Sequence, residues 1–316
     1  MNDLERAIDA VVNDCLAIHE GERVLVVCNP ASQRLGERLR SAAQDVRADA
    51  ILAVMAERAS HGAEPPEPIA AAMREADVVL APTIQSLSHT AARRAANEAG
   101  ARIATLPEVT EDMLARLMSA DMARLRVRSR AVAEVLTRGS EARITCPNGS
   151  DLRLGLAGRD AIPDTGELQE PGEFSNLPCG EGFIAPVEGT GEGTLFVDGT
   201  IATVGVANEP VELTVREGHL VGASGENGAR LMELLTLHGP DATNVAELGI
   251  GTNEKARISG EVLEDEKILG TAHVAFGASA GIGGTIQVPV HLDCVVTKPD
   301  LEIDGRLLVR GGELLV

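Results

Sequence analysis

Residues 244–293 read NVAELGIGTNEKARISGEVLEDEKILGTAHVAFGASAGIGGTIQVPVHLD and contain three short strand-type runs between glycine-rich turns. These runs are VAELGIG, GTAHVAFG and VPVHLD. Short runs of this kind, rich in apolar residues and bounded by glycine, predict β-strands. The stretch therefore indicates a β-rich fold for the C-terminal part of the chain.

The same three runs carry side chains that can bind a metal ion. His291 and Asp293 are two residues apart, so on a strand they project from the same face. His273 lies in the second run and Glu247 in the first. Two histidines and a carboxylate are a known metal-ligand set. We weigh a metal site equally against an ordinary hydrogen-bonded His–Asp pair.

The N-terminal half alternates strands and helices. Buried strand-type runs lie at 21–28, 50–56, 77–83 and 101–107, and helical spacing of apolar residues is found at 3–19, 30–48, 89–100 and 108–136. Continuous apolar strands between helices predict a parallel sheet covered on both faces. We therefore predict an open parallel α/β domain at residues 1–139.

From residue 140 onward the chain is rich in Gly, Val, Thr and Asp. Residues 141–156, EARITCPNGSDLRLGL, predict a hairpin around Asn148-Gly149. Residues 228–239, GARLMELLTLHG, have helical spacing and are the exception in this half. We predict that residues 140–316 form a mostly β domain that binds metal and carries the catalytic site. The fold class is thus α/β followed by a β-rich domain.

The charge balance limits the possible partners. The formal net charge is −20, which argues against binding to nucleic acid or to an anionic membrane. Only three residues are lysine, Lys255, Lys267 and Lys298, so arginine supplies nearly all of the positive charge. Excess acid with little lysine is typical of salt-loving organisms. A GC-rich genome, which also favours arginine, is the alternative explanation.

Cysteine usage and the N-terminus suggest a cytoplasmic location. The five cysteines are dispersed and show no paired spacing, which fits a reducing compartment. The N-terminal residues form an acidic amphipathic pattern that differs from a signal peptide, and no apolar run approaches the length needed to cross a membrane. We expect a soluble, cytoplasmic protein.

Two further segments have simple structural interpretations. The acidic run Glu264–Glu266 is predicted to be a solvated turn. The glycine-rich segment 277–285, GASAGIGGT, is predicted to be a loop, with a mobile lid as the alternative. No GxGxxG or P-loop motif follows the first strand run, which argues against a dinucleotide or nucleoside triphosphate site.

Five motifs of the C-terminal half, in this order, resemble the aminopeptidase T / aminopeptidase S family of metallopeptidases. They are NLPCGEGFIAPVEGTGEGTLFVDG (176–199), AELGIGTN (246–253), ILGTAHVAFG (268–277), VHLD (290–293) and KPDLEIDG (298–305). The resemblance implies a homodimeric, metal-dependent exopeptidase that acts on small peptides. It also implies two divalent ions, zinc, cobalt or manganese, which activate a bridging water for attack on the peptide bond.

The resemblance also assigns roles to particular residues. It implies that the metal ligands are Glu181, Glu247, His273, His291 and Asp293. Glu181 or Glu247 would act as the general base. One member of the family's site is missing, because the family has a tyrosine after the first histidine and this chain contains no tyrosine; Ala280 stands near that position.

Each of these residues also has a purely structural interpretation. Glu181 would then be an exposed turn residue, Glu247 a surface acid at a strand end, and His273 a core histidine bonded to the backbone.

A second family is similar on the same residues, the mononuclear iron enzyme family of 2,5-dihydroxypyridine 5,6-dioxygenase. This resemblance implies one Fe(II) held by His273, His291 and Asp293, with open positions for a hydroxylated ring and dioxygen. Its stretch before HLD carries a glycine pair like that in residues 283–285. The two extra glutamates favour the aminopeptidase, and the missing tyrosine favours the dioxygenase. We take the aminopeptidase as the main prediction, the dioxygenase as the alternative, and a non-catalytic binding relative as the third possibility.

Overall fold

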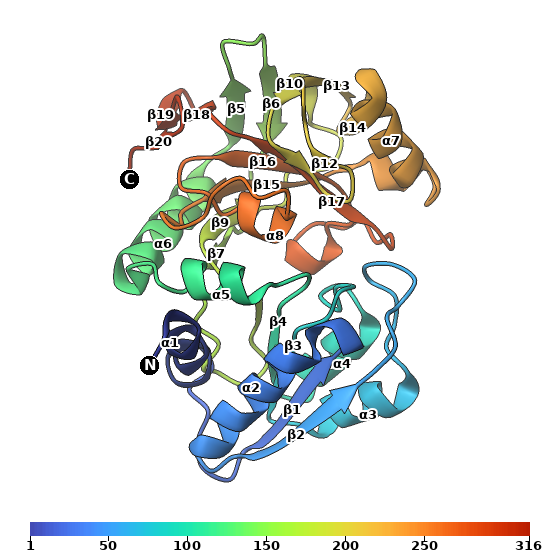
Figure 1. Cartoon of the computed structure of the whole chain (residues 1–316). Coiled ribbons are helices and arrows are strands. Elements are labelled where there is room, and N and C mark those ends of the chain that lie inside the picture. Colours follow the sequence, from blue (N-terminus) through green and yellow to red (C-terminus); the bar gives the residue numbers. More distant parts are fainter. The chain divides into compact units, whose positions relative to one another are not determined.

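A computed structural model describes all 316 residues, which fold into two compact units. The first unit comprises residues 1–120 and 166–179, and the second comprises residues 121–165 and 180–316. Figure 1 labels the elements of both. The predicted fold class, an α/β part followed by a β-rich part, is confirmed.

The first unit is a parallel α/β layer structure. Its five-stranded sheet has the order β2-β1-β3-β4-β8, and all of the pairs are parallel. Helices α1, α2 and α5 pack together on one side, and α3 packs with α4 (Figure 1). The elements are α1 (Asp3–Ala10), β1 (Arg23–Cys28), α2 (Gln33–Asp45), β2 (Asp49–Val54), α3 (Glu67–Glu75), β3 (Val78–Ala81), α4 (Ala91–Glu98), β4 (Arg102–Thr105), α5 (Glu111–Leu117) and β8 (Phe174–Asn176).

The core of the first unit explains why its strands read as unbroken apolar runs. Strands β3 and β4 are buried at every position, because helices cover both faces of a parallel sheet. Asn29, directly after β1, donates from Nδ2 to the carbonyl of Met55 at 3.0 Å and accepts from the amide of Ile84 at 2.8 Å. This side chain therefore ties together the segments that follow β1, β2 and β3.

The second unit contains two antiparallel sheets. One has the order β14-β13-β10-β6-β5-β18-β19-β20, and the other β12-β11-β17-β16-β15-β9-β7. Helix α6 packs on β7 and β9, and α7 packs on β13 and β14. The elements are α6 (Met122–Arg138), β5 (Glu141–Thr145), β6 (Asp151–Gly155), β7 (Ile162–Asp164), β9 (Glu181–Ile184), β10 (Glu192–Val197), β11 (Thr200–Ile201), β12 (Gly205–Val206), β13 (Val211–Arg216), β14 (His219–Ala223), α7 (Gly225–Thr236), β15 (Val245–Gly251), α8 (Val262–Asp265), β16 (Ala272–Gly277), β17 (His291–Val296), β18 (Asp300–Ile303), β19 (Arg306–Arg310) and β20 (Glu313–Leu314).

One apolar core lies among the elements of this unit and draws alternate residues from the strands of both sheets. The predicted hairpin at 141–156 is present as β5 and β6, and Gly149 in its turn has a φ of 106°. Ala142, Ile144, Leu152 and Leu154 point into the core, while Arg143 and Asp151 form an ion pair on the outer face. The period of two in the sequence thus matches one buried and one exposed face.

The prediction of one continuous helix over 108–136 is wrong. This segment divides into α5 and α6, because Asp121 accepts from the backbone amide of Arg124 and starts a new helix. The two units separate between these helices, whereas the expected domain boundary at 139/140 falls after α6. The first helix also ends its regular part at Ala10 and continues as a wider turn over Val11–Cys15.

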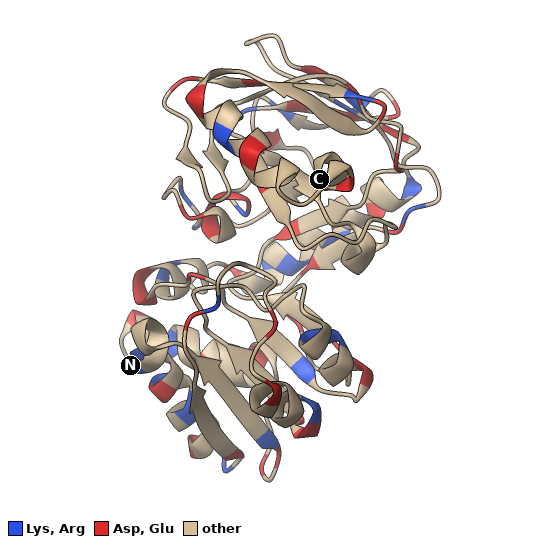
Figure 2. Cartoon of the chain, turned by 90° about the vertical axis from the view of Figure 1, so that its right-hand side faces the viewer, with Lys and Arg blue, Asp and Glu red and all other residues tan.

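Strand β8 belongs to the parallel sheet although it follows β7 in the chain. Acidic side chains are spread over both units and outnumber basic ones (Figure 2). None of the helices combines the length and the apolar character needed to cross a bilayer.

Candidate metal centre

Four neighbouring strands carry all five of the residues that the sequence singled out. Their order in the sheet is β17-β16-β15-β9. Strand β17 holds His291 and Asp293, β16 holds His273, β15 holds Glu247, and β9 begins at Glu181.

Strand alternation explains why these side chains share one face. The residues that flank them along each strand belong to the apolar core of the second unit, and they are Ile184, Leu248, Ile250, Val274, Phe276, Leu292 and Cys294. Successive strand side chains point to opposite faces, so the site residues lie on the face away from this core. The register brings the strands into line, with Gly249 opposite His273 and Ala275 opposite Asp293.

His273 is fully buried between two carboxylates. Its Nε2 lies 3.2 Å from Glu181 Oε2 and 3.2 Å from Glu247 Oε1. Glu181 and Glu247 are themselves only 5% and 7% exposed, so neither is the exposed acid of the alternative interpretation. The backbone-bonded alternative for His273 also fails, because its Nδ1 is buried without a hydrogen-bond partner.

His291 is held on both sides of its ring. Its Nε2 lies 3.3 Å from Glu247 Oε2 and 3.5 Å from Asp293 Oδ1. Its Nδ1 lies 2.8 Å from the carbonyl oxygen of Ala278. A carbonyl can only accept, so this contact places a proton on Nδ1 and makes Nε2 the nitrogen that could bind a metal ion.

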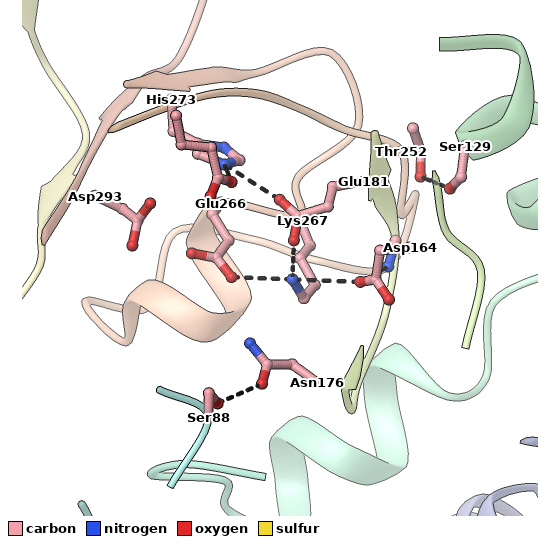
Figure 3. Close-up of polar contacts among 12 residues, drawn as sticks. Ser88, Ser129, Asp164, Asn176, Glu181, Thr252, Glu266, Lys267, His273 and Asp293 are labelled. Atoms are coloured by element: carbon pink, nitrogen blue, oxygen red, sulfur yellow. Dashed lines mark hydrogen bonds and ion pairs between the residues drawn. The ribbon is translucent and has the colours of Figure 1, made fainter. Parts of the chain in front are cut away.

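Sequence reasoning missed three members of the cluster, Lys267, Glu266 and Asp164. Lys267 Nζ lies 2.7 Å from Glu181 Oε1, 2.9 Å from Glu266 Oε1 and 3.5 Å from Asp164 Oδ2 (Figure 3). The available signal was the rarity of lysine in this chain together with the acidic run that precedes Lys267.

The acidic run Glu264–Glu266 is not a solvated turn, so that prediction is wrong. All three side chains are buried, because α8 and its flanks supply them with partners. Asp265 accepts from the amides of Ser259 and Gly260 and from two hydroxyls, and Glu264 accepts from the amide of Arg257. Glu266 joins the site instead.

The acidic and basic side chains of the cluster shift one another's pKa values. Burial lowers the pKa of His273, but Glu181 and Glu247 outweigh it and raise that pKa well above its usual range. His291 behaves in the same way, with Asp293 and Glu247 opposing burial. Burial raises the pKa of Glu181, yet Lys267 and His273 bring it down to about 2. Burial raises the pKa of Glu266 to about 8, because Lys267 compensates it only in part.

This donor set fits a divalent cation. Three groups of side chains have ligand atoms within 4.8 Å of one another: Glu181, Glu247 and His273; Glu247, His291 and Asp293; and Glu266, His273 and Asp293. Glu181 Oε2 is buried without a hydrogen-bond donor, as expected of an atom that faces a cation. Imidazole nitrogens with carboxylate oxygens suit zinc, manganese and iron.

The loop between β16 and β17 is anchored beside this centre. Glu188 Oε1 accepts from the amide of Thr285 at 2.7 Å and from its hydroxyl at 3.0 Å. Arg159 pairs with Glu188 and also donates to the carbonyl of Gly283. The segment 277–285 therefore has fixed contacts at its far end, as well as the contact of Ala278 with His291.

The fold and the site together define a class: a protein with a parallel α/β unit and an antiparallel β unit that holds a histidine–carboxylate metal-binding cluster. Within that class, the chain belongs to the 2,5-dihydroxypyridine 5,6-dioxygenase (NicX) family, whose sequence profile matches residues 3–316. The 2,5-dihydroxypyridine 5,6-dioxygenase of Pseudomonas putida is 24% identical over 258 residues, which cover 77% of this chain and 72% of that protein.

Two solved structures have a similar fold. The 2,5-dihydroxypyridine dioxygenase of Pseudomonas putida KT2440 has a TM-score of 0.85 at 21% identity and covers 100% of this chain and 98% of its own. Wild-type AmpT from Thermus thermophilus has a TM-score of 0.73 at 20% identity, with 99% of each chain covered.

The predicted aminopeptidase activity is therefore wrong, and with it the assignment as a hydrolase or metalloprotease. The family match and the Pseudomonas putida relative favour the alternative prediction, a dioxygenase. The likeness to AmpT is one of fold.

Proposed function

We propose that this protein is a ring-cleaving dioxygenase that acts on a small hydroxylated ring of the pyridine type. The observation that carries the proposal is the match of a dioxygenase family to nearly the whole chain, including every residue of the metal centre. The name of the Pseudomonas putida relative gives the substrate to test first, 2,5-dihydroxypyridine.

The proposed metal complement is one Fe(II) with His273, His291 and Asp293 as ligands, of which Asp293 belongs to a candidate ligand group of each histidine. Two histidines and one carboxylate are the ligand set of non-haem iron oxygenases, and they leave positions open. Iron bound there would offer open coordination positions to the ring and to dioxygen, and it would supply one-electron chemistry toward dioxygen. The burial of His273 and Asp293 supports the proposal, since a buried centre keeps water away from reactive species.

The protein's own groups would bind the substrate and manage its protons. A hydroxylated ring that binds as its anion gives up a proton, and we assign Glu247 as the proposed acceptor of this proton. Its two oxygens lie 3.2 Å from His273 Nε2 and 3.3 Å from His291 Nε2. Glu181, which contacts Lys267 and His273, is the second candidate for proton transfer. In this proposal both glutamates transfer protons to or from a ring substrate, whereas the aminopeptidase prediction gave them a role in peptide hydrolysis.

The test is oxygen uptake by protein loaded with Fe(II) under anaerobic conditions and then mixed with 2,5-dihydroxypyridine and air-saturated buffer. We expect equimolar loss of ring absorbance and dioxygen, and both atoms of ¹⁸O₂ in the product. His291→Ala and Asp293→Ala should lose iron and activity together. His238→Ala is the matched control, because His238 is exposed.

Absence of oxygen uptake with every hydroxylated pyridine tried would reject the proposed function. Equal activity with zinc in place of iron would reject the proposed metal. A homodimer in solution, which the family resemblance implied, is a separate proposal that light scattering on the purified protein would test.

A further inference from the structure

Lys267 is a fully buried cation whose partners are all carboxyl groups. Its side chain is 0% exposed, and its Nζ has three carboxyl oxygens at 2.7, 2.9 and 3.5 Å. An ammonium group has three hydrogens to donate, so Glu181, Glu266 and Asp164 match its capacity. The distances from Lys267 Nζ to Glu181 and Glu266, 2.7 and 2.9 Å, are those of charge-assisted hydrogen bonds. A carboxylate that binds zinc lies closer to the ion, at about 2.0–2.2 Å.

Glu181 connects this cation to the metal centre. Its Oε1 lies 2.7 Å from Lys267 Nζ, while its Oε2 lies 3.2 Å from His273 Nε2 (Figure 3). In a two-metal site, one carboxylate commonly bridges the two ions. Here the same carboxylate lies between the histidine side of the centre and an ammonium group.

The position of Lys267 is fixed by the backbone. The backbone amide of Lys267 donates to the carbonyl oxygen of Glu264. The carbonyl oxygen of Lys267 accepts from the amide of Asn253, which follows β15, at 2.9 Å. This approach requires Gly251, because a Cβ added there would lie 2.0 Å from the carbonyl oxygen of Ile268. The ammonium group is therefore held beside the site and is not a flexible side chain that happens to reach it.

We propose that Lys267 occupies the place of a second cation and thereby restricts the centre to one divalent ion. The ammonium engages Glu181, Glu266 and Asp164, and its positive charge repels a second dication that would need the same carboxylates. Lys267 is thus a residue that determines metal stoichiometry. The inference rests on the proposed one-metal function and adds the residue responsible for it.

The test is metal stoichiometry in Lys267→Met, a variant of similar length without the charge. Mn²⁺ serves as the probe because carboxylates and imidazoles both bind it and it needs no anaerobic handling. Ions per chain are counted by mass spectrometry after gel filtration and by titration calorimetry. Lys298→Met, at an exposed lysine, is the matched control.

We expect one ion per chain in the wild type and in Lys298→Met, and two in Lys267→Met. In titrations, the second site of Lys267→Met should be at least tenfold tighter than any second site of the wild type. We also expect Mn²⁺ beyond the first equivalent to raise the melting temperature of Lys267→Met and not that of the control.

One ion in both the wild type and Lys267→Met would overturn the inference and leave the proposed function intact, since another feature would then set the count. Two ions in the wild type would overturn the inference directly. No metal in any form would instead reject the proposed function.

If Lys267→Met does not fold, the same measurements are made on the double variant Lys267→Met/Glu266→Gln, which removes the cation together with one carboxyl partner. Glu181 and Asp164 remain in it, so a second Mn²⁺ site at least tenfold tighter than in the wild type is again expected. Equal second-site affinities in the double variant and the wild type would overturn the inference.

Discussion

Gly249 on β15 lies directly opposite His273 on β16, and a Cβ added to Gly249 would lie 2.1 Å from His273 Nε2. The imidazole thus occupies space that any other residue at position 249 would fill. A glycine two positions after Glu247 on the same strand face is part of the metal centre, although it offers no ligand atom.

Gly249→Ala should therefore weaken metal binding without removing a ligand. The added methyl group must displace the ring of His273, and we expect a loss of about 10- to 100-fold in metal affinity, the range seen when the support of a ligand is disturbed. Titration calorimetry measures it. Gly222→Ala is the control, because its nearest neighbour would lie 3.8 Å from the new Cβ. Equal affinities of the two variants would contradict the steric explanation.

Glu188→Gln should also reduce metal affinity, by about tenfold. Glu188 anchors Thr285 and pairs with Arg159, and the loop that these contacts hold carries the Ala278 carbonyl that orients His291. Faster hydrogen exchange of the amides in 278–286 should accompany the loss. Glu209→Gln, at an exposed position, should change neither quantity. Unchanged exchange in Glu188→Gln would show that the anchor does not stabilise this loop.

Asp265→Asn should destabilise the second unit by about 3 kcal/mol, because hydrogen bonds to a buried charged acceptor contribute about 1.5–3 kcal/mol each. The carboxylate of Asp265 accepts from Ser259, Gly260 and Thr200. Thermal unfolding monitored by circular dichroism is the measurement. Asp160→Asn, at an exposed aspartate, should stay within about 0.5 kcal/mol of the wild type. A similarly small change in Asp265→Asn would mean that the network tolerates an amide.

The first unit should lose stability in acid through Glu22. Its carboxylate accepts from both terminal nitrogens of Arg102 at 2.9 Å, and Arg102 is nearly buried. Burial raises the pKa of Glu22, but Arg102 outweighs it, so the folded-state pKa lies below the ordinary value of 4.5. A depressed carboxyl pKa stabilises the fold above the unfolded value, and this contribution is lost as the pH falls through the folded value.

Glu22→Gln should accordingly cost about 1.5–3 kcal/mol at pH 7 and progressively less as the pH falls below 4.5, because the carboxyl of the unfolded wild type is protonated first and that of the folded protein follows at its lower pKa. Melting temperatures of both proteins between pH 3 and pH 7 give the comparison. Glu20→Gln, whose partner Arg47 is exposed, is the control and should melt like the wild type throughout. A constant difference between Glu22→Gln and the wild type over this range would rule out titration of Glu22 as the cause.

Several features were predictable from the sequence because they depend on local periodicity. The alternation of strands and helices predicted the parallel sheet, and the period of two at 141–156 predicted the β5–β6 hairpin. His291 and Asp293 share a face for the same reason. Motif resemblance added Glu181, which the structure places 3.2 Å from His273.

The choice between two activities was not predictable from those motifs. The same residues of this chain resembled both the peptidase and the dioxygenase families, so the motifs could not separate the two activities. Extra carboxylates were taken as evidence for a second metal, and no local pattern showed that Lys267 contacts one of them, Glu181. A match along the whole chain was needed to correct the activity.

The sequence by itself determined the strand and helix pattern, the face on which each strand presents its side chains, and the placing of His291 and Asp293 on one face, because these follow from neighbours a few residues apart. Only the tertiary structure decided that Lys267, Glu266 and Asp164 enter the centre, that β8 joins the first sheet, and that Glu264 and Asp265 are buried. Those outcomes depend on contacts between residues up to 103 positions apart, such as Lys267 with Asp164. Burial and charge compensation between distant segments arise only once the strands have paired. They leave no periodic signal in the sequence, and local patterns therefore cannot predict them.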